Sequence, residues 1–116
     1  MEIRIKNLRL RTYIGIESWE QEKPQDIVIN IRVRFDGDAA ALSDHIEGTV
    51  NYKKMTKQVI HLVEGNRFGL LENLANQIAD IAMTEALVDS CEVEVDKPHA
   101  LRFSDSVSIT VQKQRT

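Results

Sequence analysis

The clearest pattern in the chain runs from residue 27 to residue 35, where apolar odd-numbered residues alternate with mostly polar even-numbered ones. A period of two predicts a β-strand with one buried and one polar face. Residues 91–96 and 107–111 alternate in the same way and predict two further strands. The chain therefore contains at least three segments that each bury one face.

Near the N-terminus the alternation changes phase. Ile3 and Ile5 are odd-numbered, whereas the apolar residues between positions 8 and 14 are even-numbered. One extra residue in a strand produces such a shift, so we expect a β-bulge around Lys6 and Asn7 within a fourth strand.

Two segments in the middle of the chain have the period of an α-helix. Asn51 precedes the first as an N-cap, and Gly65 ends it. The polar connection before it, residues 39–48, leaves room for one helical turn. The apolar stripes are Tyr52, Met55, Val59, Ile60 and Val63 in the first helix, and Leu71, Leu74, Ala75, Ile78, Ile81 and Ala82 in the second.

The order strand, strand, helix, helix, strand, strand predicts an α+β fold. A four-stranded antiparallel sheet with two helices on one face would bury every apolar stripe. Such a sheet leaves two unpaired edges, which natural proteins cover, charge or pair. We therefore expect a ring-shaped homo-oligomer. The uncovered face of the sheet would carry Arg4, Arg32, Arg34, Glu92, Glu94 and Asp96.

Composition narrows the class of protein. A chain of 116 residues with 42% hydrophobic content predicts one domain over residues 1–116. The net charge of -3 argues against a general nucleic-acid binder, whose affinity needs surplus lysine and arginine. No segment approaches the roughly 18 apolar residues of a membrane span, and the first residues lack the apolar core of a signal peptide. With Cys91 as its single cysteine, the chain is expected to be cytoplasmic.

Two residues far apart in the sequence suggest proton-transfer chemistry. Lys97 stands where an alternating strand meets Pro98, and Glu20 lies in a polar loop after the first strand. A carboxylate and an amine that the fold brings together can move a proton without a metal or cofactor. From the residues alone, however, the better interpretation is that Lys97 and Glu20 are two ordinary surface residues without a chemical role. The three histidines, His45, His61 and His99, have no spacing typical of a metal site.

Five short motifs stand in order along the chain: Tyr13-Ile-Gly15-Ile, Glu20, Thr49-Val-Asn-Tyr52, Leu70-Leu-Glu72-Asn-Leu-Ala and Val95-Asp-Lys97-Pro-His. Together they resemble the dihydroneopterin aldolase family over almost the whole chain. Residues 3–11, 25–30, 66–68 and 99–108 are similar to the 2'-epimerase branch of that family. The resemblance implies the tunnelling fold, in which four subunits close their sheets into a barrel and two such rings stack into an octamer. It also implies active sites between neighbouring subunits.

The resemblance assigns roles to the motif residues. It implies that Glu72 anchors the pterin ring, although an acidic residue in a first helical turn is also favoured by the helix dipole. Glu20 and Lys97, with an ordered water, would take a proton from the 2'-hydroxyl of the substrate. Tyr52 would reach into the neighbouring subunit's site and act on the enol carbon, whereas on pattern alone a packing role is about as plausible. Further pterin-site positions would be Val50, Asn51, Gln25 and Leu71.

Three lysines, Lys53, Lys54 and Lys57, stand in the first turns of the predicted first helix, where positive charge opposes the helix dipole. Asp44 and Glu47 could offset them, and so could an anionic ligand. The candidates for binding a triphosphate are Lys53, Lys54, Arg11 and Arg102.

The expected activity is epimerisation at C2' of 7,8-dihydroneopterin triphosphate to the monapterin form, by retro-aldol cleavage and re-formation of the C1'–C2' bond, without a metal or cofactor. One alternative is a dihydroneopterin aldolase of folate synthesis. Another is an oligomeric module that binds a pterin or purine without catalysis, in which Glu20 and Lys97 have no chemical role. The expected partners are a small pterin and further copies of the chain, with no nucleic acid and no membrane.

Overall fold

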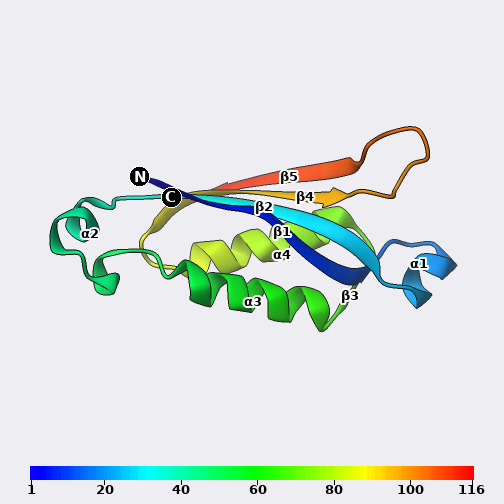
Figure 1. Cartoon of the computed structure of the whole chain (residues 1–116), viewed down its shortest axis with the longest axis horizontal. Coiled ribbons are helices and arrows are strands. Elements are labelled where there is room, and N and C mark those ends of the chain that lie inside the picture. The colour runs from blue at the N-terminus through cyan, green and yellow to red at the C-terminus, as the bar shows by residue number, and fades with distance from the viewer.

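A computed structural model describes all residues from 1 to 116 and contains the expected order of long elements. Four long strands and two long helices form the body of the molecule (Figure 1). The strands are β1 (Glu2–Ile14), β2 (Gln25–Phe35), β4 (Val88–Lys97) and β5 (Val107–Gln114), and the helices are α3 (Tyr52–Glu64) and α4 (Leu71–Thr84). The fold class is α+β, as the sequence predicts.

The sheet has one strand more than expected. Its order is β3-β1-β2-β4-β5, where β3 (Arg67–Phe68) is a two-residue strand parallel to the end of β1. The four long strands pair antiparallel, as predicted. A two-residue strand has no periodicity of its own, so the sequence pattern could not reveal it.

The predicted bulge in β1 is present. The pairing of β1 with β2 shifts between Ile5 and Leu8, and Asn7 between them has a φ of 53°. Asn30 of β2 holds this bulge: its side-chain oxygen accepts a hydrogen bond from the Asn7 backbone N–H at 2.9 Å. The bulge brings the apolar residues on both sides of it to the same face of the sheet.

Helix α3 begins and ends where the sequence predicts. The Asn51 side chain accepts a hydrogen bond from the Lys54 backbone N–H at 3.1 Å, and Gly65 follows the last turn. Residues 39–48, expected to hold one helical turn, contain the short helix α2 (Asp38–Ser43) and a 3₁₀ turn (Ile46–Gly48). The glutamate expected in a loop, Glu20, instead lies in a second short α-helix, α1 (Ser18–Glu22).

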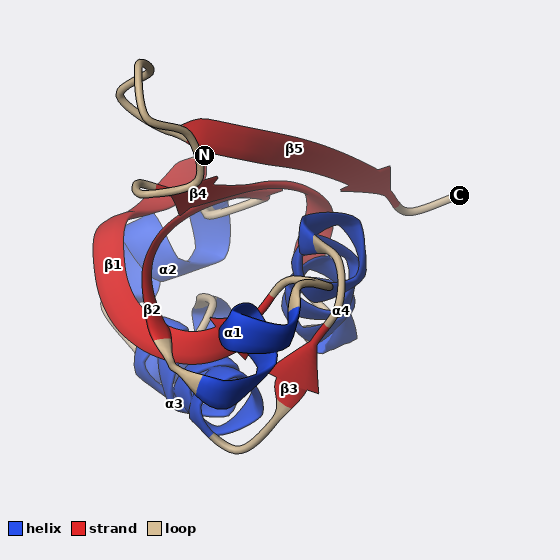
Figure 2. Ribbon diagram, turned by 90° about the vertical axis from the view of Figure 1, so that its right-hand side faces the viewer, coloured by secondary structure: helices blue, strands red, loops and turns tan.

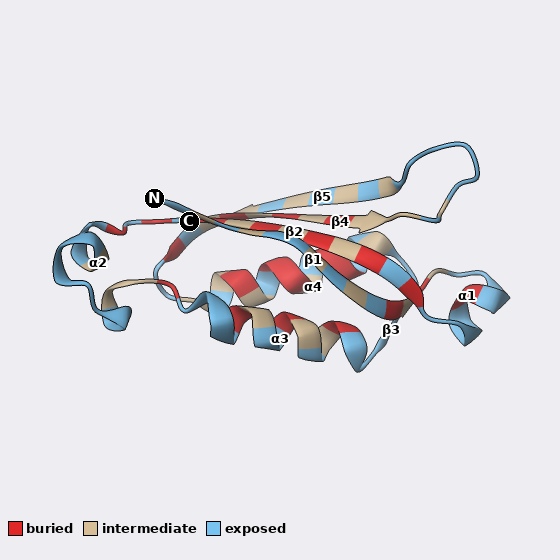
Figure 3. Ribbon diagram, viewed as in Figure 1, coloured by how far each residue is buried: buried red, intermediate tan, exposed pale blue.

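The hydrophobic core lies between the sheet and the two long helices, which cover one face of it (Figures 1 and 3). The inward residues of the central strands β2 and β4 are buried, together with one face of each long helix. On the edge strands β1 and β5, most of the corresponding apolar residues are only half buried. The sheet is strongly curled, so that its uncovered face is also curved (Figure 2).

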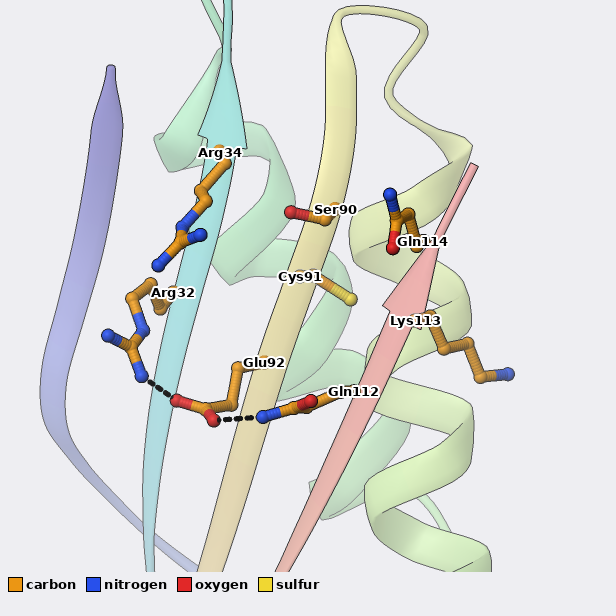
Figure 4. Close-up of a pocket in the computed structure, with 8 residues that line it drawn as sticks. All are labelled: Arg32, Arg34, Ser90, Cys91, Glu92, Gln112, Lys113 and Gln114. Carbon is orange, nitrogen blue, oxygen red and sulfur yellow. Dashed lines mark hydrogen bonds and ion pairs between the residues drawn. The ribbon is translucent and has the colours of Figure 1, made fainter. Parts of the chain in front are cut away.

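The uncovered face of the sheet, called here the open face, is polar, as predicted. Arg32 of β2 makes an ion pair with Glu2. It also pairs with Glu92, which accepts a hydrogen bond from Gln112 at 2.7 Å (Figure 4). The hydrogen bond from Arg32, followed by that from Gln112, lowers the pKa of Glu92. In the lining of this cavity of about 370 Å³, Arg32 and Glu92 therefore neutralise each other, whereas Arg34 has no ion pair.

Candidate active site

The structure brings Glu20 and Lys97 into direct contact. Lys97 is the last residue of β4, and its Nζ donates a short hydrogen bond to Glu20 Oε2 in α1. The side chains are 13% and 9% exposed, so most of the pair is shielded from water. An ion pair of this kind is much less weakened by solvent than one at the surface.

Two more groups hold the Glu20 carboxylate. Gln25, the first residue of β2, donates from Nε2 to Glu20 Oε2 at 3.1 Å and to the Ile14 carbonyl at 2.8 Å. The Glu17 backbone N–H donates to Glu20 Oε1 at 3.3 Å. Burial by itself raises the pKa of Glu20, but the hydrogen bonds from Lys97, Gln25 and Glu17 outweigh it and leave the pKa lowered. The resting site therefore contains an ionised carboxylate.

Gly15 makes room for this carboxylate. The residue has a φ of +130°, and a Cβ placed on it would collide with the carboxyl group of Glu20. Its backbone N–H donates to the Phe68 carbonyl at 2.9 Å, which ties the end of β1 to β3. Only glycine combines this backbone conformation with the close approach.

The lowered pKa of Glu20 predicts a pH-dependent contribution to stability. We expect Glu20→Gln to reduce the free energy of unfolding at pH 7 by about 1–3 kcal/mol, because hydrogen bonds to an ionised group are lost. A depressed pKa stabilises the fold above the unfolded value near 4.5, and the stabilisation is lost as the pH falls through the folded value. Urea unfolding of both proteins between pH 3 and 7 should show the difference closing below about pH 4.5. A difference that stayed constant over this range would contradict the assignment.

The other residues predicted to line a pterin site lie at two ends of the molecule, and three of them lie near Glu20 and Lys97. Gln25 lies at the Glu20–Lys97 pair, and Glu72 and Leu71 lie in the first turn of α4 at the same end of the sheet (Figure 1). Glu72 is exposed and Leu71 is half buried. Gln25 has a more specific place than the sequence suggested, since its amide orients Glu20. Contact of these residues with a pterin stays a prediction.

Tyr52, Val50 and Asn51 lie at the opposite end of α3 from the Glu20–Lys97 pair (Figure 1). A helix of 13 residues is about 20 Å long, so Tyr52 of the same chain cannot reach Lys97. The side chain of Val50 is fully buried, and that of Asn51 caps α3. Within one chain, these three residues therefore do not lie in the same site as Glu20 and Lys97.

The triphosphate candidates are also spread over several places. Lys53 and Lys54 lie on the exposed first turn of α3. Arg11 lies on the open face, where its Nε is 3.1 Å from Asp26 Oδ1. Arg102 lies in the connection between β4 and β5, with its guanidinium 5.7 Å from the Phe103 ring centroid. One chain does not gather them into one site.

Three features of this end of the molecule were not found from the sequence. Gly15 belonged to a motif, but its contact with Glu20 depends on tertiary structure. Arg67 of β3 lies 3.9 Å from the Tyr13 ring centroid and donates to the Gln21 carbonyl, so it holds the end of α1. Arg9, two residues before Arg11 on the same face of β1, lines a cavity with it. The arginine spacing was visible in the sequence, but the cavity was not.

Two further observations concern the whole chain. No helix is both long and apolar enough to cross a membrane. No three histidine, cysteine, aspartate or glutamate side chains lie together in an arrangement that could hold a metal ion.

The fold and the shielded ion pair define a class: small α+β proteins in which a curled antiparallel sheet places a carboxylate–amine pair at its strand ends. The chain belongs to the dihydroneopterin aldolase family, because the family model "FolB: Dihydroneopterin aldolase" matches residues 3–112. The family expected from the motifs is therefore confirmed.

Named relatives separate two branches of this family. The chain is 51% identical to the dihydroneopterin triphosphate 2'-epimerase of Escherichia coli K12, over 97% of this chain and 94% of the relative. It is 48% identical to the enzyme of the same name from Pseudomonas aeruginosa, over 97% and 92%. The crystal structure of E. coli dihydroneopterin aldolase in complex with neopterin has a TM-score of 0.92 at 27% identity, covering 97% of this chain and 98% of that one. The fold is thus shared with the aldolase, whereas the sequence is much nearer to the epimerases.

Proposed function

We propose that this protein epimerises 7,8-dihydroneopterin triphosphate at C2', giving the monapterin form. The observation that carries the proposal is the shielded contact between Glu20 and Lys97, in a chain about half identical to named 2'-epimerases. The pair supplies a proton acceptor and a proton donor at one place, as reversible carbon–carbon bond cleavage requires. A bacterial cytoplasm is the compartment that fits these relatives.

The proposed reaction begins when the pair, through a water molecule, removes the proton of the 2'-hydroxyl. The C1'–C2' bond then breaks, C2' becomes an aldehyde, and the electron pair of the bond passes into the reduced pterin ring as an enol. The aldehyde fragment turns its other face, the bond forms again, and the proton returns to the oxygen at C2'. The number of atoms and electrons is unchanged, so no oxidant or reductant is needed.

Glu20 and Lys97 have different tasks in this scheme. The carboxylate, held by Gln25 and the Glu17 N–H, is fixed in position and keeps the amine of Lys97 directed toward the strand ends. For Lys97 to accept a proton its amine must first be neutral, which desolvation by a bound pterin would favour. Glu72 at the N-terminus of α4 is the proposed anchor, since a carboxylate can accept from the amino group and ring N–H of a pterin.

We propose further that the working unit is a homo-oligomer, an octamer of two tetrameric rings, with each site shared by two neighbouring chains. Three observations support sharing. Both edges of the sheet are largely unpaired, apolar residues on the edge strands are half exposed, and Tyr52 lies at the far end of α3, a helix about 20 Å long, from the pair of its own chain. In addition, Glu20, Lys97 and Glu72 line none of the main cavities of the single chain.

Mixed oligomers test the shared site. Lys97→Ala and Tyr52→Ala should each be nearly inactive, but oligomers reassembled from an equal mixture should regain about a quarter of wild-type turnover, because that share of sites receives both native residues. The matched control mixes Lys97→Ala with Glu20→Gln. These residues meet within one chain, so no site in that mixture is complete and no activity should return. If the Lys97→Ala and Tyr52→Ala chains assemble into mixed oligomers but no activity returns, the site is not shared between chains.

Product analysis tests the function itself. Purified protein is incubated with 7,8-dihydroneopterin and, separately, with its triphosphate, and the stereoisomers and cleavage products are resolved by chromatography. Epimerisation predicts the monapterin isomer as the main product from the triphosphate. The fold shared with the E. coli aldolase makes aldolase activity the second candidate. It predicts a 6-hydroxymethyl pterin instead, with glycolaldehyde from dihydroneopterin and the triphosphate ester of glycolaldehyde from the triphosphate. Binding without turnover would leave only a non-catalytic pterin-binding module.

A further inference from the structure

A second cavity lies on the opposite side of the sheet from the catalytic pair. It measures about 360 Å³, within the range of small-molecule sites, and its lining includes Arg9, Arg11, Asp26, Pro98 and His99. Pro98 and His99 follow Lys97 directly, and Asp26 follows Gln25. Because successive strand residues point to opposite faces, the cavity lies across the sheet from the Glu20–Lys97 pair, at the same strand ends.

This cavity carries positive charge that the protein does not neutralise. Asp26 is the only carboxylate in its lining, and it contacts Arg11 at 3.1 Å and His99 at 4.0 Å. Arg11 is also held by the Pro24 carbonyl at 3.3 Å, whereas Arg9 has no ion pair. Two guanidinium groups therefore face one carboxylate. In the cavity of Figure 4, Arg32 is paired with Glu92 and also with Glu2 outside the lining, whereas Arg34 has no ion pair.

The spacing of the arginines suits an extended anion. Residues two apart on one face of a strand are separated by about 7 Å, so Arg9 and Arg11 can each contact a different phosphate of one chain. Guanidinium groups bind phosphate oxygens through paired, charge-assisted hydrogen bonds. Asp26 keeps Arg11 directed toward the cavity without cancelling the charge of Arg9.

We propose that this cavity binds the triphosphate chain of the substrate, which passes from the Glu20–Lys97 pair around the shared strand ends, and that it thereby retains the aldehyde fragment after the C1'–C2' bond has broken. The inference rests on the proposed function. The fragment that separates from the pterin carries the triphosphate, so an anchor on the phosphates lets the aldehyde turn its other face without diffusing away. Arg9 and Arg11 are then specificity residues, which favour epimerisation over release of the cleavage products.

Binding of inorganic tripolyphosphate tests the site without any catalysis. Isothermal titration calorimetry on the assembled protein should show dissociation constants raised about tenfold or more in Arg9→Gln and Arg11→Gln. Arg34→Gln is the matched control, because Arg34 is also exposed on the open face, lacks an ion pair and lies at the far end of β2. Its dissociation constant should change less than about twofold. Circular dichroism establishes that all variants are folded.

Several results would overturn the proposal. Unchanged tripolyphosphate affinity in both arginine variants would do so, as would an equal loss in Arg34→Gln. A loss confined to the double variant Lys53→Gln/Lys54→Gln would place the phosphates on α3 instead. If tripolyphosphate binding depends on Arg9 and Arg11 but the wild-type protein forms no epimer, the site stands and the proposed function fails.

The products of the arginine variants test retention of the fragment. With dihydroneopterin triphosphate, Arg9→Gln and Arg11→Gln should release a several-fold larger share of 6-hydroxymethyl pterin relative to epimer than the wild type. A variant that only damaged the fold would lower both products together. An unchanged ratio, measured at saturating substrate, would refute a role of the cavity in retaining the fragment.

Discussion

Replacing Lys97 by alanine should lower the turnover number of epimerisation by about 10²–10⁴-fold, the range typical of a lost general acid or base. The amine lies against the Glu20 carboxylate at the end of β4, and no other lysine lies in that contact. Initial rates with saturating dihydroneopterin triphosphate measure the loss. The affinity for the pterin should change far less, since the proposed ring anchor is Glu72.

The chain offers a matched control for this variant. Lys113 of β5 also projects from the helix-covered face of the sheet and pairs with a carboxylate on a helix, Asp80 of α4. Lys113→Ala removes an ion pair of the same kind, although a more exposed one, away from the strand ends that hold the site. It should leave the turnover number within about twofold of the wild type, because partly exposed ion pairs contribute little. Equal losses in both variants would mean that Lys97 acts only through stability.

The second large effect is expected at Gly15. Alanine there would push the Glu20 carboxylate out of its position and would strain a backbone with a φ of +130°. We expect a loss of about 10²-fold in turnover from the displaced carboxylate, and about 1–3 kcal/mol in stability from the strained backbone. Steady-state kinetics and thermal unfolding measure the two effects separately.

Gly69→Ala is the control for the Gly15 variant. Gly69 lies in the same part of the molecule, but it has no positive φ, and a Cβ there would meet only Ile16 Cγ2 at 3.9 Å, an ordinary contact. The variant should therefore fold and turn over normally. A normal turnover number in Gly15→Ala would show that the position of Glu20 is not essential.

The local periodicity of the sequence was sufficient for most of the fold. Alternation over residues 27–35 placed β2, and the change of phase near Asn7 placed the bulge. The caps Asn51 and Gly65 marked both ends of α3. These features depend on neighbouring residues, so a linear pattern contains them. The two-residue β3 and the short helix α1 were not predicted, because segments of this length have no period to detect.

The candidate site was predicted only in part. The motif resemblance selected Glu20 and Lys97, whereas their types and positions favoured two ordinary surface residues. The role of Gln25 as a donor to Glu20 and the cavity beside Arg9 were not foreseen. Both arise where the ends of different strands meet, and the sequence does not state which strands are neighbours or which side chains share an end.

The sequence by itself thus determined most of the residues that face the core, where the long elements lie and where α3 begins and ends, and to which family the chain is similar; Tyr52, which it assigned to the buried stripe of α3, is 51% exposed. Each of these follows from residues close together in the chain or from motifs in a fixed order. Only the tertiary structure decided that Glu20 and Lys97, 77 positions apart, share a hydrogen bond shielded from water. The physical reason is that antiparallel pairing of β2 with β4 brings the start of one strand beside the end of the other, and periodicity cannot specify that choice of partner.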